Sequence, residues 1–274
     1  MLTHVDAISS QGSLLSLPLE DLETGLMLDS IEGLDPVKAT IVTTSFAGQD
    51  GGEYQSSRRE ERDLKLKISL EPDYALEETV RQLRKRLYKT FMPKAAVQLT
   101  FHTTDENPWI INGRVEDFNN DQFSSEPTVD IDIRCSNPDF IDPIPVKVSG
   151  NSVSNTNEFL VPYDGTVESG MKFVIKPNRN LAAFTIYHRA PDGMSRSMDF
   201  AGALINGDTL TITTSHGAKG AVLKRSTTES SLLWGIDPRS TWFELQNGDN
   251  YFRVFATGAA IPFDMEFINR YGGL

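Results

Sequence analysis

The chain has 274 residues, 39% of them hydrophobic, and a formal net charge of −12. This length allows one large or two modest domains, each with its own core. No apolar run approaches the roughly 18 residues of a membrane-spanning helix, and the N-terminus lacks the basic and apolar regions of a secretory signal, so we expect no membrane insertion. The single cysteine excludes an internal disulfide bond and a multi-cysteine metal site.

The negative charge is concentrated in the first half of the chain. Residues 1–140 contain 25 acidic and 14 basic side chains, a net −11, whereas residues 141–274 contain 13 and 12, a net −1. An acidic surface argues against sequence-independent nucleic-acid binding, which needs lysine and arginine to neutralise phosphates. The negative charge either keeps the protein soluble or forms a surface along which DNA can pass without binding.

The first 70 residues predict strands and a turn. Short apolar patterns at residues 14–19 and 25–28 indicate one or two strands. Gly33 and Pro36 predict a turn, because glycine tolerates positive φ and proline fixes φ. The β-branched residues at 40–46 predict a half-buried strand, and alternation over residues 64–70 places four apolar side chains on one sheet face.

A polar segment, residues 47–63, separates these two predicted strands. It contains Asp50, three arginines (Arg58, Arg59 and Arg62) and Tyr54, with no apolar cluster from which to build a core. A connection of this length in a compact domain is usually functional or disordered. We interpret it as an arm that reaches for another subunit.

One amphipathic helix is predicted from apolar residues at steps of four and three, which are Leu76, Val80, Leu83, Leu87 and Phe91. Asp73 is the expected N-cap, Glu77 and Glu78 lie in the expected first turn, and Pro93 ends the helix. The basic cluster at residues 81–89 is expected to be a solvated face. Contact with nucleic acid or an acidic partner is the alternative, although no aromatic side chains interleave with the charges.

Three further strands are expected at residues 97–101, 109–115 and 129–135. Asn112 and Gly113 predict a hairpin turn or a bulge within the second of them. Cys135 continues the apolar alternation of the third, which indicates a buried small side chain. One helix among about six strands predicts an α+β sandwich for this part of the chain.

A proline-rich segment at residues 136–145 predicts an exposed joint between two domains, 1–140 and 141–274. Beyond it the sequence shows no helix pattern and regular turn signals, which is typical of an all-β sandwich. The expected strands are 146–148, 170–175, 183–188, 210–213, 221–224, 230–233, 242–245, 251–256 and 263–270.

No active site is evident in the sequence. The histidines are His4, His102, His188 and His216, and they show no metal-ligand spacing. We expect His188 and His216 to face solvent. No nucleophile elbow, P-loop or dinucleotide fingerprint occurs, and carboxylate pairs such as Glu60 and Glu61 or Glu116 and Asp117 are adjacent, so in a strand they point to opposite faces. We therefore predict no catalytic, cofactor-binding or metal-binding residues.

Two groups of residues carry a resemblance to a known family. The first group consists of Gly33, Leu34, Pro36, Asp50, Gly51, Arg62, Leu64, Leu66 and Leu70. The second consists of Gly207, Asp208, Leu210, Ile212, Val222, Trp242, Phe243, Leu245, Gly248, Asn250, Phe267 and Tyr271. In this order they resemble the N-terminal and the galectin-like C-terminal domains of siphophage distal tail proteins.

The resemblance implies a structural protein of the virion, assembled in the host cytoplasm. Six copies would form a ring through the N-terminal domain, join the tail tube protein to tail-tip hub, fibre or receptor-binding proteins, and let DNA through. It implies no cofactor, no catalysis and no specific nucleic-acid binding.

Two alternatives remain open. One is a carbohydrate-binding adhesion module, in which Trp234, Trp242 or Tyr187 stacks on a sugar ring; we expect these side chains to fill the core instead. The other is a glycan-active enzyme with a carboxylate pair brought together from distant positions.

Overall fold

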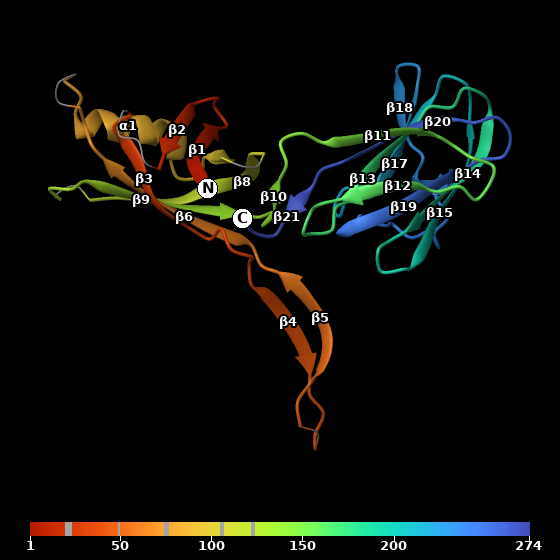
Figure 1. The fold of residues 1–274 in the computed structure, drawn as a ribbon, viewed down its shortest axis with the longest axis horizontal. Coiled ribbons are helices and arrows are strands. Elements are labelled where there is room, and N and C mark those ends of the chain that lie inside the picture. Colours follow the sequence, from red (N-terminus) through yellow and green to blue (C-terminus); the bar gives the residue numbers. More distant parts are fainter. Residues whose placement is uncertain (20–23, 49, 74–76, 105–106, 122–123) are drawn as a thin grey trace. The chain divides into compact units, whose positions relative to one another are not determined.

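The structure is a computed structural model that describes residues 1–19, 24–48, 50–73, 77–104, 107–121 and 124–274 (Figure 1). The chain divides into two compact units, one of residues 1–143 with 272–274 and one of residues 144–271. We keep the domain limits expected from the sequence, 1–140 and 141–274, as a proposal. The mainly β class with a single α-helix among the described residues is confirmed.

Unit 1 is built on an antiparallel sheet with the strand order β2-β1-β7-β8-β9-β6-β3. Its strands are β1 (Leu2–Ser9), β2 (Leu14–Pro18), β3 (Leu26–Glu32), β6 (Arg62–Leu70), β7 (Ala96–Thr103), β8 (Trp109–Asn120) and β9 (Thr128–Cys135). A short strand, β10 (Phe140–Ile141), also pairs with β8. The predicted alternation holds, because Leu64, Leu66, Ile68, Leu70 and Cys135 are all at most 1% exposed. Burial raises the pKa of the Cys135 thiol to about 12.

Helix α1 (Val80–Phe91) packs on this sheet through Leu83, Leu87 and Phe91. It begins later than the sequence suggested. Thr79 is the N-cap and forms a capping box with Gln82, so Asp73 is not the cap and no acidic residue lies in the first turn. Leu76, the first residue of the predicted stripe, lies outside the described residues.

The pair Asn112 and Gly113 marks neither a turn nor a bulge. Both lie inside β8, whose register with β9 shifts only further along, between Val115 and Asp117. A β-carbon at Gly113 would lie 2.5 Å from a methyl group of Ile133 and 2.8 Å from Cys135 Sγ. The glycine is required for close packing and not for a change of chain direction.

Unit 2 is a β-sandwich, as predicted. One sheet has the order β11-β20-β13-β16-β17-β18 and the other β12-β19-β14-β15. The first sheet contains β11 (Val146–Asn151), β13 (Met171–Ile175), β16 (Thr209–Thr213), β17 (Gly220–Arg225), β18 (Thr228–Ser231) and β20 (Pro262–Phe267). The second contains β12 (Phe159–Tyr163), β14 (Leu181–Arg189), β15 (Ser195–Leu204) and β19 (Gly248–Phe255). Unit 2 also contains a 3₁₀ turn, η2 (Leu233–Gly235), and a short strand that lies outside both sandwich sheets, β21 (Arg270–Tyr271).

The strand expected at residues 242–245 does not form. Phe243 and Leu245 are buried in the core, but the segment makes only an isolated bridge, from Leu245 to Ser169. Its apolar side chains fill the sandwich without a ladder of backbone hydrogen bonds. Strand β19 instead begins at Gly248, whose φ of +103° favours glycine, and pairs with β12 and β14.

The proline-rich joint is shorter than expected. Asp139 is 2% exposed and Phe140 is fully buried in unit 1, because both contact side chains of that unit. Ser136 and Asn137 are exposed, but the chain is exposed again only at Pro143 and Ile144, the latter at 75%. The expectation that all of residues 136–145 are exposed is therefore wrong.

His188 is buried in the core of unit 2 and does not face solvent. It is 1% exposed, and its ring stacks on Phe252 with the centroids 4.5 Å apart. The amide nitrogen of Asn250 donates to two backbone carbonyls, so its Oδ1 accepts a hydrogen bond from His188 Nε2 at 3.0 Å. Desolvation lowers the pKa of His188 below its ordinary value of 6.5, so the ring is neutral in the folded protein.

This burial predicts a loss of stability in mild acid. The unfolded chain takes up a proton at His188 as the pH falls from about 7 to about 5, whereas the folded chain resists it, so protonation favours unfolding. The thermal unfolding midpoint should fall over this range by calorimetry. His188→Gln retains a donor for Asn250 but does not titrate, so it should reduce this pH dependence. The exposed His216 serves as control: if His216→Gln reduces the pH dependence as much, the assignment to His188 is wrong.

Candidate assembly interface

Unit 1 carries a two-stranded ribbon, which we call the arm, formed by β4 (Ala39–Thr44) and β5 (Glu53–Arg59) (Figure 1). Every residue of both strands is exposed. The prediction that the strand at 40–46 is half-buried is therefore wrong. The segment predicted as a polar arm, residues 47–63, is itself partly a strand, because it contains β5. The arm pairs within itself, from Ala39 with Arg59 to Thr44 with Glu53.

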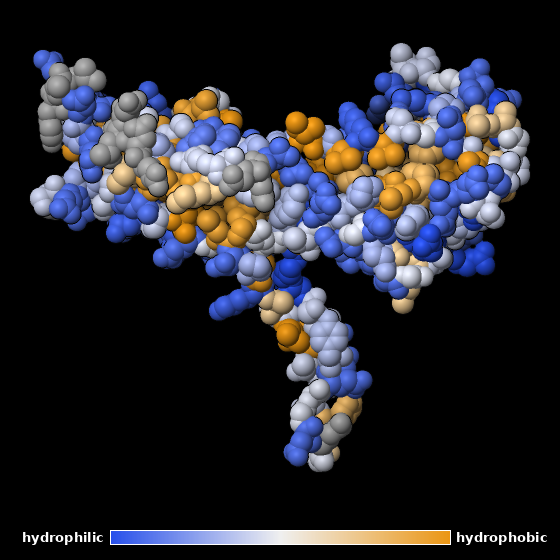
Figure 2. Space-filling view, in the orientation of Figure 1, coloured by the Kyte–Doolittle hydropathy of each residue, from blue (hydrophilic) through white to orange (hydrophobic). Residues whose placement is uncertain are grey.

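The arm exposes four large apolar side chains to solvent. Ile41 is 61% exposed, Val42 50%, Phe46 56% and Tyr54 60%. Figure 2 shows hydrophobic and hydrophilic groups interleaved along the arm. Since neighbouring residues of a strand point to opposite faces, Ile41 and Val42 make both faces of the ribbon apolar.

An arm of this kind has little stability of its own. An isolated two-stranded ribbon is marginal in water, and this ribbon leaves the outer edges of β4 and β5 unpaired. Five successive β-branched residues, Thr40 to Thr44, favour an extended backbone strongly. Exposed apolar faces and open edges are the features with which a strand ribbon docks on another chain.

The root of the arm is anchored by charged groups. Arg59, the last residue of β5, donates from Nη1 to Asp139 Oδ1 and from Nη2 to Oδ2, the second at 3.1 Å. The Asp139 side chain is fully buried and the Arg59 side chain is 40% exposed, so this two-pronged pair lies at the boundary between the core of unit 1 and solvent. The Glu60 amide donates to the Lys38 carbonyl at 2.9 Å, which closes the ribbon at its base.

Arg62, the first residue of β6, is 1% exposed and lies just beyond this root. The sequence placed it in the polar arm, which is wrong. Its Nε donates to the Pro138 carbonyl at 2.7 Å, and its Nη2 donates to the Gly272 carbonyl at 2.6 Å. Its Nη1 donates to two carbonyls of the turn before the arm, those of Gly33 and Asp35.

Arg62 therefore joins three segments of unit 1 that are far apart in the sequence. The guanidinium also lies over the Phe140 ring, 4.5 Å from its centroid. Burial lowers the pKa of Arg62, and Asp139 opposes that effect; an arginine nevertheless stays charged at neutral pH.

Glycines allow the close approach that this arrangement needs. Gly33 has a φ of +90°, as its predicted turn requires, and a β-carbon there would lie 2.1 Å from the Asp63 carbonyl oxygen. Near the C-terminus, a β-carbon at Gly273 would lie 2.8 Å from the Pro36 ring. The turn and the C-terminal residues thus pack directly against neighbouring groups of unit 1.

One member of each acidic pair noted in the sequence, Glu61 and Glu116, belongs to a surface ion network. Arg134 lies 3.0 Å from Asp63, 3.1 Å from Glu116 and 3.9 Å from Glu61. The hydrogen bond that Arg134 donates to Asp63, together with the surrounding carboxylates, raises the pKa of Arg134. These acids converge on an arginine and do not form an opposed pair.

Two arginines of the basic helix are used inside unit 1. Arg84 donates to the Asp121 carbonyl at 2.6 Å, and Arg86 donates to the Thr24 carbonyl at 2.9 Å and contacts Glu78. Arg81, Lys85 and Lys89 are exposed.

Among the described residues no helix has the length and hydrophobicity to cross a membrane.

The aromatic candidates for sugar stacking differ in burial. Trp242 is partly buried against the core of unit 2, and Tyr187 lies beneath the Arg253 guanidinium at 3.9 Å. Trp234 is 73% exposed, so the expectation that it fills the core is wrong. It borders a groove of about 460 Å³ in unit 2 together with Asp199 and Asp237.

The sequence and the fold were compared with known proteins. Residues 20–133 match the model of the phage tail protein RIFT-related domain. The crystal structure of SPP1 Dit, described as a paradigm of the hub adsorption apparatus in phages infecting Gram-positive bacteria, has a TM-score of 0.67 at 15% identity, covering 97% of this chain and 98% of that chain.

The phage P2 baseplate in its activated conformation with calcium has a TM-score of 0.49 at 8% identity, covering all of both chains. No protein of the curated set matches the sequence. At these identities the likeness to SPP1 Dit establishes a shared fold.

Replacing Arg62 should destabilise unit 1. Arg62→Lys keeps the charge but cannot reach the four carbonyls at once, so we expect the free energy of unfolding to fall by about 2–4 kcal/mol in urea denaturation followed by circular dichroism. Arg58→Lys, at a side chain that is 79% exposed, is the matched control and should stay within about 0.5 kcal/mol of the parent. Equal effects of the two substitutions would contradict the role assigned to Arg62.

Proposed function

Because residues 20–133 match the model of the phage tail protein RIFT-related domain, we propose that this chain is a structural protein of a phage tail tip whose copies assemble into a ring. Six copies form the ring, and it joins the tail tube protein to tail-tip hub, fibre or receptor-binding proteins. The protein resides in the virion after assembly in the host cytoplasm.

The observation that carries this proposal is the arm. Its root is fixed by the pairing of Arg59 with the buried Asp139 carboxylate, whereas Ile41, Val42, Phe46 and Tyr54 are at least half exposed. Burying one such side chain stabilises a complex by roughly 1.5–3 kcal/mol. A second copy of the chain is the partner proposed for this surface, because a repeated arm-to-neighbour contact closes a ring of identical subunits.

Passage of DNA through the ring is part of the proposal. The net charge of −11 on residues 1–140 supports it, because like charges repel phosphate over about 8 Å at physiological salt. Arg84 and Arg86 support it as well, because their side chains already bind groups of unit 1. The protein itself binds no specific nucleic-acid sequence.

The role is structural and not catalytic. Among the described residues, each acid of the adjacent pairs noted in the sequence has a partner within unit 1: Glu61 and Glu116 have Arg134, Glu60 has Thr40, and Asp117 accepts from the Phe118 amide. Such pairing supports a surface network of ionic contacts. A glycan-active enzyme would instead need two carboxyl groups that face one substrate from opposite sides. No cofactor enters this proposal.

A second candidate function, glycan binding by unit 2, is favoured by one observation. Trp234 is 73% exposed beside a groove of about 460 Å³. An exposed indole offers an apolar face to a pyranose ring, and the carboxylates of Asp199 and Asp237 could accept hydrogen bonds from sugar hydroxyl groups. This function is compatible with membership of a ring.

Disrupting the arm should dissociate the ring. The double substitution Ile41→Asp with Val42→Asp places a charge on each face of the ribbon, and burying an unpaired charge is very costly. By native mass spectrometry we expect the parent to form six chains of 30.5 kDa each and the variant to be a monomer. Because both side chains are exposed in the isolated chain, circular dichroism should show both proteins equally folded.

The matched control is Leu160→Asp, which charges an apolar side chain of unit 2 that is 48% exposed. It should leave the mass of the assembly unchanged. A parent that stays monomeric at all concentrations, or an arm variant with the parental mass, would refute assembly through the arm.

Trp234→Ala should abolish any glycan binding by unit 2. We expect the parent to bind members of an array of bacterial cell-wall polysaccharides. Removal of the indole should weaken that binding about tenfold, since an aromatic contact contributes about 0.5–1.5 kcal/mol in addition to its buried apolar area. Trp242→Phe, at a side chain packed on the core, should retain binding. If the parent binds no glycan, this second function is rejected while the ring proposal stands.

A further inference from the structure

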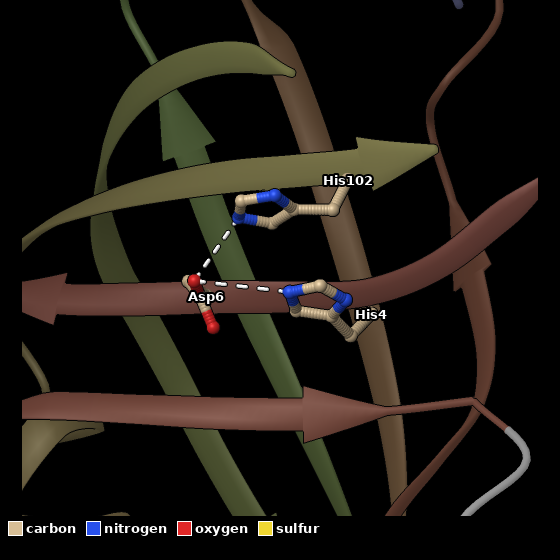
Figure 3. Close-up of side chains that lie close together, drawn as sticks. All are labelled: His4, Asp6 and His102. Atoms are coloured by element: carbon tan, nitrogen blue, oxygen red, sulfur yellow. Dashed lines mark hydrogen bonds and ion pairs between the residues drawn. The ribbon is translucent and has the colours of Figure 1, made fainter. Parts of the chain in front are cut away.

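A cluster of two histidines and one aspartate lies on the outer face of the sheet of unit 1 (Figure 3). His4 and Asp6 are two residues apart on β1, so their side chains share a face. His102 on β7 is the direct cross-strand partner of His4. The alternate residues of β1, Val5 and Ala7, are buried on the opposite face.

The potential ligand atoms of the three side chains lie within 4.8 Å of one another. Asp6 Oδ2 is 3.0 Å from His102 Nε2 and 4.0 Å from His4 Nε2. Two imidazoles thus direct the same ring nitrogen toward one carboxylate oxygen (Figure 3). The side chains are 38%, 27% and 30% exposed for His4, Asp6 and His102, so an ion can reach them from solvent.

A hydrogen bond behind the cluster determines which nitrogen of His4 carries the proton. Thr3 Oγ1 lies 3.0 Å from the His102 carbonyl oxygen and 3.0 Å from His4 Nδ1. The carbonyl can only accept, so it takes the hydroxyl proton of Thr3, and the hydroxyl oxygen must then accept from His4 Nδ1–H. His4 Nε2 is left with a lone pair that faces Asp6.

This arrangement matches the support that metal-binding histidines usually have. A ligating imidazole typically donates its second N–H to an oxygen acceptor, which fixes the tautomer and the ring orientation. In a neutral His4 the Nε2 lone pair faces the negative Asp6 carboxylate without a proton between them. A cation at this position satisfies both groups.

We propose that His4, Asp6 and His102 bind one divalent transition-metal ion of the zinc class through His4 Nε2, His102 Nε2 and an Asp6 carboxylate oxygen. Two imidazoles and a carboxylate are a donor set for zinc, whereas calcium and magnesium prefer oxygen ligands. Three protein ligands leave a fourth tetrahedral position for solvent or for a group from another molecule.

Metal binding requires only small side-chain movements. Zinc bonds of about 2.0–2.2 Å place tetrahedral ligand atoms about 3.3 Å apart, which lies between the two separations from Asp6 Oδ2. The His4 and His102 rings stack with their centroids 4.1 Å apart and 7° between their planes. For their lone pairs to converge, both rings must turn about the Cβ–Cγ bond, a torsion with a broad preference. The proton that His102 Nε2 donates to Asp6 must also move to Nδ1, so that Nε2 is free to bind the metal.

The test uses the full chain without a polyhistidine tag, freed of metal with a chelator. Isothermal titration with Zn²⁺ should show one ion per chain with a micromolar or tighter Kd, and Co²⁺ should give the intense visible absorption of a tetrahedral complex, which Zn²⁺ then removes. Asp6→Asn, His4→Ala and His102→Gln should each weaken zinc binding at least about tenfold, and Thr3→Val should weaken it by about tenfold. The His102→Gln variant retains an amide donor for Asp6, so the local hydrogen bond persists.

His216→Ala is the matched control, because His216 is an exposed histidine in a turn of unit 2, and its Kd should equal that of the parent. The proposal is overturned if the parent takes up no zinc at micromolar free metal. It is also overturned if the His4, Asp6 and His102 variants bind zinc as tightly as the parent, or if calcium binds at this cluster as tightly as zinc.

Discussion

The arrangement of unit 1 around the arm depends on one buried cation, Arg62. A charge removed from water is tolerated only where oxygen atoms surround it, and Arg62 obtains four carbonyl oxygens, with the Asp139 carboxylate adding a favourable charge. These oxygens belong to the turn before the arm, the segment after β9 and the C-terminal residues. The need to solvate one guanidinium therefore holds three chain segments in place at the same time.

This constraint explains why the chain is partitioned as it is. The carbonyl of Gly272 is a ligand of Arg62, which explains why residues 272–274 belong to unit 1 although unit 2 precedes them in the sequence. Pro138 and Phe140 are held in the same way, the first by its carbonyl and the second by its ring. The middle of the segment that composition marks as a linker is therefore part of a folded unit, and the chain is exposed again only from Pro143.

The elements that the sequence predicted well are those that short-range periodicity determines. Alternation over β6 and β9 gave the buried face of the sheet correctly, and regular strands with turn signals gave the sandwich of unit 2. Failures occurred where tertiary contacts decide. The β-branched run of β4 has the composition of a buried strand, and Asn112 with Gly113 has the composition of a turn. Only the neighbouring strands show that the first is solvent-exposed and the second lies mid-strand.

Residues of chemical interest were harder still to predict. His102 and Asp6 are 96 positions apart, and only the register between β1 and β7 brings them together. Arg62 looked like one of several charges in a polar arm, since sequence carries no signal for its four backbone acceptors. Trp234 was expected in the core on the general preference of tryptophan. It is exposed, whereas Gly235 at the end of η2 and Ile236 just after it are buried.

The arm has an anchored root and two exposed strands, β4 and β5, and this combination lowers the entropic cost of binding a partner. Ordering a flexible segment costs roughly 1–2 kcal/mol per residue in backbone entropy. Over the residues of β4 and β5 this cost would exceed the gain from burying four apolar side chains at roughly 1.5–3 kcal/mol each. Anchoring the root through Arg59 and Asp139, and forming the ladder between β4 and β5 in advance, removes much of that cost before a partner arrives. The burial of Ile41 and Val42 can then contribute its free energy to association. The anchored root is therefore what allows two strands without tertiary contacts of their own to bind a partner.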